Sequence, residues 1–249
     1  MSSYQVLARK WRPHDFDTIV GQEHVVTALT RALTEKRLHH AYLFTGTRGV
    51  GKTTISRIFA KALNCQGADG HGDMTAHPCG VCPACRAIDE GRFPDYIEMD
   101  AASNRSVEDM TALLERAMYA PTQGRFKVYM IDEVHMLSIS AFNALLKTLE
   151  EPPERVIFVL ATTAPHKVPV TIRSRCQHIP FHGMTLEQIV NRLKQVSEAE
   201  RIDARDEALW EIARNSEGGM RDALSILDQC AALAEGTITA ERVRQILGL

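Results

Sequence analysis

The sequence lacks any segment able to cross or enter a membrane. No apolar run reaches about 18 residues, the length that a bilayer-spanning helix needs. The first residues, 1–5, also lack the apolar core of a secretion signal. Six cysteines in a chain without such a signal favour free thiols and metal ligation over disulfides. These absences predict a cytoplasmic protein that makes no membrane contact.

The chain also lacks an excess of charge of either sign. Its 29 Lys and Arg residues face 31 Asp and Glu residues, a net charge of -2 over 249 residues. Such a balance gives no overall attraction to nucleic acid, so any DNA contact must come from a local basic patch or from an assembly with other chains. The hydrophobic content of 45% allows one large domain and a small one.

Residues 46–53 are the most informative stretch of the chain. They read Gly-Thr-Arg-Gly-Val-Gly-Lys-Thr, directly after the apolar run 41–44 and directly before the helix-favouring segment 54–63. A buried strand that leads through a glycine-rich turn into a helix is the context of a phosphate-binding loop, because backbone N–H groups there point at phosphate oxygens. A glycine-rich turn that matches by chance is the alternative.

This loop predicts a site for the phosphates of a nucleotide. Lys52 can reach the β- and γ-phosphates, and the hydroxyl of Thr53 can hold Mg²⁺. The expected contacts come from Gly46, Thr47, Arg48, Gly49, Val50, Gly51, Lys52, Thr53 and Thr54.

Two further apolar runs end in polar residues that fit the same chemistry. Residues 128–131 lead into Asp132 and Glu133, and the next run ends at Thr162 and Thr163. We expect Asp132 to bind Mg²⁺, often through water, and Glu133 to orient and deprotonate the attacking water. A polar loop start is the plainer alternative for that pair. Thr163 is expected to contact the water or the γ-phosphate, with Thr162 in reserve, although threonines also simply favour strands.

Apolar runs and helical patterns alternate over most of the chain. Strands are predicted at 41–44, 96–99, 126–131, 156–160 and 177–181, and helices at 54–63, 107–118 and 142–149. Strands separated by helices predict an α/β fold with a parallel, helix-covered sheet, whose ligand chemistry gathers at the carboxyl ends of the strands. The predicted domain covers residues 1–182.

Past residue 181 the pattern is wholly helical. Residues 183–249 therefore predict a small all-α domain, with a hinge near Gly183. Thr185 is expected to cap the first helix, and further helices are expected around 209–213, at 221–233 and at 240–247. The apolar stripe of that first helix is predicted to consist of Leu186, Ile189, Val190, Leu193 and Val196.

The cysteines Cys65, Cys79, Cys82 and Cys85 have the spacing of a metal site, C-x13-C-x2-C-x2-C. Two-residue gaps let thiolates converge on one metal, and four sulfurs favour Zn²⁺ in a closed structural site. An iron–sulfur cluster is the alternative, although ferredoxins place their next cysteine three residues later and before proline. One further alternative is that His71 or His77 replaces Cys65. The zinc module is expected within residues 64–90, and Cys176 and Cys230 are expected to be ordinary buried thiols.

Several stretches together resemble AAA+ ATPases and, more narrowly, the gamma/tau family of bacterial DNA polymerase III clamp-loader subunits. The match lies in residues 4–13, 20–24, 46–53 and 126–153, in the Ser-Arg-Cys motif at 174–176 and in Gly-Met-Arg-Asp-Ala-Leu at 219–224. The resemblance covers nearly the whole chain. It implies an AAA+ domain with a zinc insertion, followed by a helical lid, and ATP as the nucleotide.

The resemblance also assigns roles to residues that the pattern alone does not single out. In this family Arg175 would be a finger that reaches the ATP of a neighbouring subunit, although a surface arginine at a strand end would look the same. Arg221 would act within its own chain as a second sensor of the γ-phosphate. The adenine would lie against residues 8–13 and 20–22. The adenine contacts expected there are Ala8, Arg12, Pro13 and Val20.

The function that the resemblance implies is that of the motor in a clamp loader. ATP binding and hydrolysis would load a sliding clamp onto primer–template DNA, within a ring-like hetero-oligomer of clamp-loader subunits. Arg105, Arg116 and Lys147 are candidates for DNA-backbone contacts. The family continues past the position of Leu249 into a collar and, in a longer form, a tail. No polymerase active site is expected in this chain.

Two other functions compete with this one. A branch-migration or helicase motor has the same fold, but the Ser-Arg-Cys motif and the zinc insertion argue against it. A zinc scaffold that binds nucleotide without hydrolysis is the second, and the intact Lys52, Asp132 and Glu133 argue against that.

Overall fold

The computed structural model describes residues 5–103 and 107–249, so Tyr4 and the candidate DNA contact Arg105 lie outside the described part. The chain forms two compact units. The sheet unit comprises His14–Gly46 and Gly51–Phe181, and the helical unit comprises the N-terminal segment to Pro13, Thr47–Val50 and His182–Leu249. Among the described residues, no helix combines the length and the apolar character needed to cross a bilayer.

The sheet unit is built on five parallel strands in the order β2-β3-β4-β1-β5. The strands are β1 (Ala41–Thr45), β2 (Tyr96–Asp100), β3 (Lys127–Asp132), β4 (Val156–Thr162) and β5 (Gln177–Pro180). Every residue of β1 and β4 is buried, because helices cover both faces of the sheet. The predicted strands and the parallel α/β class are therefore confirmed.

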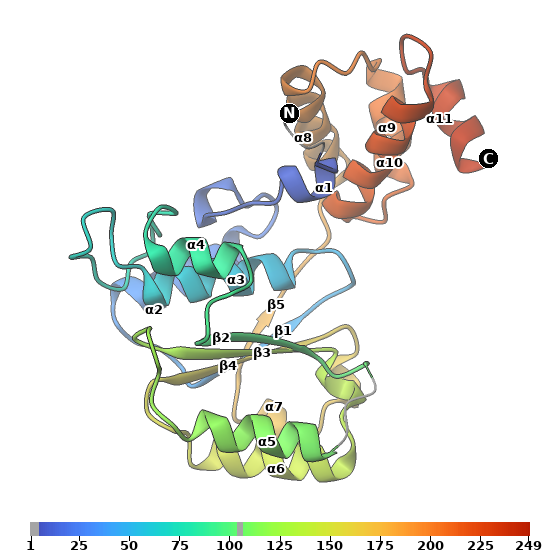
Figure 1. Cartoon of the computed structure of the whole chain (residues 1–249). Helices are drawn as coiled ribbons and strands as arrows, with labels where there is room; N and C mark the ends of the chain where they lie inside the picture. Colours follow the sequence, from blue (N-terminus) through green and yellow to red (C-terminus); the bar gives the residue numbers. More distant parts are fainter. Residues whose placement is uncertain (1–4, 104–106) are drawn as a thin grey trace. The chain divides into compact units, whose positions relative to one another are not determined.

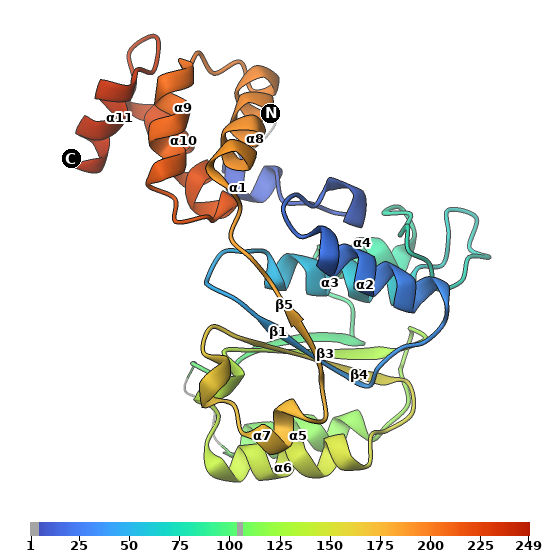
Figure 2. The ribbon, with the colours of Figure 1, turned by 180° about the vertical axis from the view of Figure 1, so that it is seen from behind.

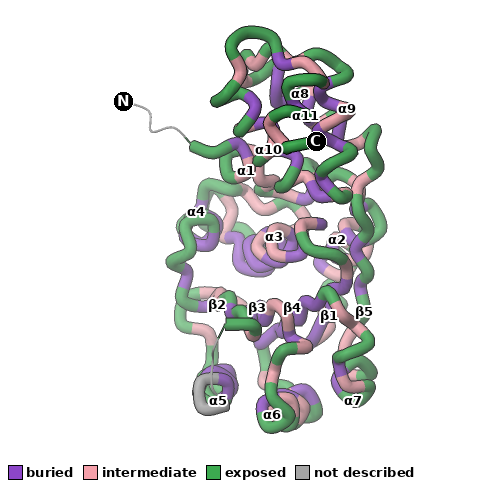
Figure 3. Tube along the Cα trace, turned by 90° about the vertical axis from the view of Figure 1, so that its right-hand side faces the viewer, coloured by how far each residue is buried: buried purple, intermediate pink, exposed green. Residues whose placement is uncertain are grey.

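Three helices cover each face of this sheet. Figure 1 and the end-on view in Figure 3 show α2 (Glu23–Thr34), α3 (Lys52–Asn64) and α4 (Pro83–Asp89) on one face. The other face carries α5 (Val107–Ala117), α6 (Ile139–Glu150) and α7 (Val170–Arg173). The short 3₁₀ turns are η1 (Phe16–Thr18), η2 (Val134–Met136) and η3 (Pro165–Lys167).

The core beneath α5 and α6 follows the predicted periodicity. Leu113 and Leu114 of α5 are 4% and 6% exposed, and they pack with Leu145 of α6 and with Tyr129 and Phe158 of the sheet. The two rings stack with their centroids 5.5 Å apart. This stacked pair adds to the packing between β3 and β4, the strands that precede Glu133 and Thr163.

Helices α2, α4 and the short α7 of the sheet unit were not predicted. Helix α2 carries its buried residues at Val25, Leu29 and Leu33, a spacing of four that would have indicated it. Helix α4 begins inside the cysteine cluster, where the metal spacing hid the helical signal. Its N-cap is Cys82, and Pro83 occupies the first helical position, where a missing N–H has no cost.

The helical unit contains α1 (Leu7–Lys10), α8 (Leu186–Ala199), α9 (Asp206–Arg214), α10 (Met220–Leu233) and α11 (Ala240–Leu247). Thr185 caps α8 as predicted, in a capping box with Gln188. The prediction for Leu186 is wrong, since it is 41% exposed. It is the first residue of α8, and the buried stripe of this helix starts one turn later at Ile189.

Helix α1 belongs to the core of the helical unit. It lies beside α8 and α10 in both views (Figures 1 and 2). Leu7 is 4% exposed there, and its N–H donates to Oδ2 of Asp228 at 2.9 Å. Trp11 donates from Nε1 to Glu200 at 3.0 Å, and Arg192 lies 5.3 Å from its ring. These contacts give the N-terminal segment a packing role in addition to the adenine contacts expected of residues 8–13.

Candidate functional site

The carboxyl ends of β1, β4 and β3 meet at one edge of the sheet. Thr45 of β1 pairs with Thr162 of β4, and the Gly46 N–H donates to the Thr162 carbonyl at 3.3 Å. On the other side of β4, Ile131 of β3 pairs with Leu160 of β4. Asp132, the next residue of β3, therefore lies at the same edge of the sheet as Thr45 and Thr162. Parallel strands therefore bring the start of the phosphate loop and the two carboxylates together, as the sequence pattern predicts.

Lys52 opens helix α3 and lies within the loop. The preceding Gly51 is its N-cap at φ +102°, a left-handed conformation that a residue with a Cβ rarely adopts. A Cβ at this position would meet nothing within 4 Å, so the backbone angle alone requires glycine. Lys52 is 7% exposed, and its ammonium group donates to the carbonyl of Gly46 at 2.5 Å. Thr53 follows in the first turn of α3, with its N–H near the anion-binding end of the helix.

The electrostatics at the end of β3 suit a divalent cation. Burial raises the pKa of Asp132, and the neighbouring carboxylates of Glu133 and Asp100 raise it further, whereas the charge of Lys52 lowers it. Asp100 pairs with Asp132 across the two strands. Since a partly desolvated carboxylate beside two others is stabilised by a bound cation, the donor set fits Mg²⁺ held by Asp132 and Thr53.

The carboxylate of Glu133 is held by the end of β4. Thr163 donates from its hydroxyl to Glu133 Oε2 at 3.1 Å. Thr162 is fully buried, and its hydroxyl is 2.8 Å from Nδ1 of His135 instead. Thr162 ends β4 and Thr163 follows the strand, and the two hydroxyls have different partners. The geometry places Thr163, the preferred candidate, at the site.

The remaining residues expected to contact the nucleotide are divided between the two units. Ala8, Arg12, Pro13, the loop residues Thr47 to Val50, and Arg221 of α10 belong to the helical unit. Val20 belongs to the sheet unit, is 39% exposed and precedes the buried Gln22 that caps α2. Their roles toward ATP stay predictions.

Arg175 follows α7. Its guanidinium contacts Glu150 at the end of α6, with Nη2 3.0 Å from Oε1. The side chain is 39% exposed, which leaves it accessible.

The prediction that Cys176 is a buried residue is only partly right. The residue is half-buried, because it lies in the turn before β5. Burial of its thiol nevertheless raises the pKa of Cys176 to about 12. Cys230 is buried as expected.

The four clustered cysteines come together in the structure. The Sγ atoms of Cys65, Cys79, Cys82 and Cys85 all lie within 4.8 Å of one another. Zinc–sulfur bonds of about 2.3 Å would place tetrahedral thiolates roughly 3.8 Å apart, so that small adjustments close the site. His77 lies 3.5 Å from Asp17 and outside this cluster.

Backbone amides surround these sulfurs as they do in metal–thiolate sites. Gln66 and Cys85 donate N–H groups to Cys82 Sγ at 3.4 Å, and Cys79 donates to Cys65 Sγ at 3.3 Å. Although burial opposes it, the backbone N–H groups near Cys79 lower the pKa of that thiol to about 7. Burial raises the pKa of the Cys85 thiol, so a bound cation would be needed to hold it as a thiolate. The donor set therefore fits Zn²⁺.

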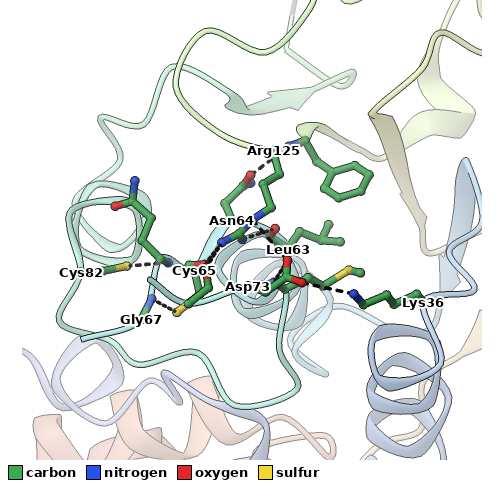
Figure 4. Close-up of polar contacts among 12 residues, drawn as sticks. Lys36, Leu63, Asn64, Cys65, Gly67, Asp73, Cys82 and Arg125 are labelled. Carbon is green, nitrogen blue, oxygen red and sulfur yellow. Dashed lines mark hydrogen bonds and ion pairs between the residues drawn. The ribbon is translucent and has the colours of Figure 1, made fainter. Parts of the chain in front are cut away.

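Arg125, which no sequence pattern singles out, ties the cysteine module to the segment that leads into β3. Figure 4 shows its guanidinium against the end of α3, where it donates to the carbonyls of Leu63 at 3.1 Å and of Cys65 at 2.5 Å. It also donates to the carbonyl of Gly72 at 2.7 Å and lies 3.6 Å from Asp73. A lone arginine before a strand carries no sequence signal for this role. Its charge satisfies carbonyls that the helix end leaves unpaired.

Comparisons with known proteins match almost the whole chain. The family model described as DNA polymerase III, delta subunit, matches residues 21–185, and the model for the clamp loader subunit ATPase lid domain matches residues 188–236. The chain is 56% identical over 246 residues to DNA polymerase III subunit tau of Escherichia coli K12, covering 99% of this chain and 38% of that protein. It is 48% identical over 247 residues to subunit gamma of Buchnera aphidicola subsp. Acyrthosiphon pisum, covering 99% of this chain and 67% of that protein.

The fold is shared more widely. The Thermotoga maritima RuvB Holliday junction branch migration motor superposes with a TM-score of 0.68 over 96% of this chain and 72% of its own, at 22% identity. This likeness shows the AAA+ fold alone. The matched family models and the relatives at 48% to 56% identity identify a single family within that fold. The chain belongs to the tau/gamma family of DNA polymerase III clamp-loader subunits, with an AAA+ ATPase fold.

Proposed function

We propose that this chain binds and hydrolyses ATP as the motor subunit of a clamp loader, and that it couples this cycle to the loading of a sliding clamp onto primed DNA. One observation carries the proposal. The phosphate-loop lysine, Lys52, and the carboxylates of Asp132 and Glu133 share one edge of the sheet, and Thr163 donates to Glu133 at 3.1 Å. This is the set of groups that nucleotide hydrolysis requires.

Each group has a distinct task in the proposed reaction. The loop amides and Lys52 bind the β- and γ-phosphates, and Thr53 and Asp132 would hold Mg²⁺. When bound there, Mg²⁺ would supply positive charge that offsets the charge of the phosphates. Glu133 orients a water and takes its proton, and Thr163 restrains the carboxylate. Hydrolysis then follows from positioning and charge stabilisation.

Full activity requires neighbouring subunits. Arg175 would reach the ATP of an adjacent chain, where such a finger is worth about 10³–10⁵ in rate. Arg221 would sense the γ-phosphate of its own chain. We assign residues 1–182 to the nucleotide-binding domain and 183–249 to the lid. We expect the assembly to be a ring-like hetero-oligomer, since each finger needs a neighbour.

The assembly would grip the clamp and primer–template DNA when ATP is bound and release both after hydrolysis. Arg116 and Lys147 are exposed and stay candidates for contacts with the DNA backbone. The Cys₄ module would bind Zn²⁺ as a structural unit. The chain spans 38% of the Escherichia coli tau subunit, so these partners are proposed for the chain as part of such an assembly. We place it in the cytoplasm, with the bacterial replication proteins it matches.

The test measures ATP turnover in a mixture with clamp, partner clamp-loader subunits and primed DNA. We expect Glu133→Gln to lower turnover about 10²–10⁴-fold while ATP still binds, since the amide keeps the shape of the side chain and loses the base. Glu154→Gln is the matched control, because Glu154 is an exposed carboxylate in the loop before β4. Unchanged turnover with Glu133→Gln would show that Glu133 is not the base.

A further inference from the structure

Glu133 occupies a backbone conformation that must be held in place. Its φ is +50°, in the left-handed region that residues with a Cβ rarely adopt. The following turn supports it, because Val134 is fully buried in the core and the Met136 N–H donates to the Glu133 carbonyl at 2.9 Å. These contacts fix the backbone of Glu133. They leave the direction of its carboxylate to other groups.

His135 is one of those groups. Its side chain is 8% exposed, with Nδ1 2.8 Å from Thr162 Oγ1 and Nε2 3.4 Å from Glu133 Oε2. The imidazole therefore bridges the fully buried hydroxyl at the end of β4 and the carboxylate that follows β3. A buried histidine between two such partners has little freedom to turn away.

The contacts on the two sides of the His135 ring favour a proton on Nε2. Thr162 Oγ1 accepts the N–H of Ala164 at 3.0 Å and can still donate its own proton to Nδ1 of His135. A neutral imidazole protonated on Nε2, or an imidazolium, has its N–H on the side of Glu133, with Nε2 3.4 Å from Oε2. The other neutral tautomer would set a lone pair against a carboxylate.

The carboxylate of Glu133 has two neighbours on the same oxygen. Thr163 donates a hydrogen bond to Oε2 at 3.1 Å, and Nε2 of His135 lies 3.4 Å from the same oxygen. The described contacts therefore leave Oε1 to accept a proton from water. Contacts from two different elements hold a carboxylate in one rotamer better than one contact can, because each restricts its rotation.

We propose that His135 is a positioning residue for the proposed base Glu133. Its Nε2 lies against Oε2 and its Nδ1 is hydrogen-bonded to Thr162, so that the carboxylate is held with Oε1 toward the attacking water. The inference rests on the proposed function, in which Glu133 takes a proton from that water. His135 itself does not touch the nucleotide or the water in this account.

The test compares His135→Leu with His135→Gln in the turnover assay with clamp, partner subunits and primed DNA. Leucine fills the space without a donor, and we expect kcat to fall on the order of 10- to 100-fold while the affinity for a non-hydrolysable ATP analogue stays within about two-fold. Glutamine can place an amide N–H near the position of Nε2, and it should restore most of kcat. An equal loss in both variants would overturn the positioning role.

A double variant separates this inference from the proposed function. If His135 acts through Glu133, His135→Leu added to Glu133→Gln should lower the remaining turnover by less than about two-fold. Full additivity of the two losses would reject the coupling. A His135→Leu protein with unchanged kcat, beside an inactive Glu133→Gln protein, would overturn the role of His135 and leave the base in place. An active Glu133→Gln protein would instead overturn the proposed base.

Discussion

Asp95 is a buried carboxylate whose removal should weaken the sheet unit strongly. Its side chain is 0% exposed and lies just before β2. Oδ1 accepts the Thr122 N–H at 2.8 Å, and Oδ2 accepts the N–H groups of Gln123 and Gly124 at 2.7 and 2.6 Å. The Asp95 carbonyl also accepts the Val128 N–H at 2.8 Å. One residue therefore fixes the loop that leads into β3, the strand that carries Asp132 and Glu133.

The size of the effect follows from these bonds. A hydrogen bond to a charged group contributes about 1.5–3 kcal/mol, so three bonds would total roughly 4–9 kcal/mol. Thr122 and Gln123 are exposed, and water can replace the carboxylate at their amides. We therefore expect Asp95→Ala to lower the free energy of unfolding by about 3–5 kcal/mol. Asp95→Asn keeps one acceptor oxygen and should cost about half as much.

The assay is urea unfolding followed by far-ultraviolet circular dichroism, with amide hydrogen exchange in β3 as a local probe. Tryptophan fluorescence would report the wrong part of the chain, because Trp11 and Trp210 both lie in the helical unit. Exchange in β3 should quicken in the order wild type, Asp95→Asn, Asp95→Ala. A loss below about 1 kcal/mol for Asp95→Ala would refute the reasoning, since it would mean that solvent satisfies all three amides.

Two further predictions concern the metal and the finger. Cys82→Ser should lose stoichiometric zinc in elemental analysis. In chelator-treated protein the alkylation of Cys79 should rise through pH about 7, because its lowered pKa makes the thiolate available as pH increases past that value. Cys176, with its pKa raised to about 12, should stay unreacted at neutral pH. Retained zinc, or alkylation of Cys79 centred near pH 9.0, would contradict the site. Arg175→Ala mixed with intact neighbours should lower hydrolysis in the adjacent subunit about 10³-fold or more; full turnover in every arrangement would reject a finger acting in trans.

Most helices and strands could be predicted from the sequence, because apolar runs and helical periodicity depend on residues near one another in the chain. The apolar runs of β1 and β4 are continuous since both faces of each strand are covered, and the period of α5 matches its buried face. The prediction that Leu186 is buried was wrong, because helical periodicity tells only which side of the helix a residue faces. It does not tell whether another element packs against the first turn of the helix.

The candidate site also contains features that the sequence predicts and features that it does not. The phosphate loop with Lys52, the carboxylate pair after β3 and the cysteine spacing can be recognised in the sequence, because each consists of residues close together in the chain. The folded chain is needed to see that Thr163 donates to Glu133, that His135 lies between Thr162 and Glu133, and that Arg125 contacts the end of α3. These contacts join elements far apart in sequence, and strand register, helix packing and burial select them after the chain has folded.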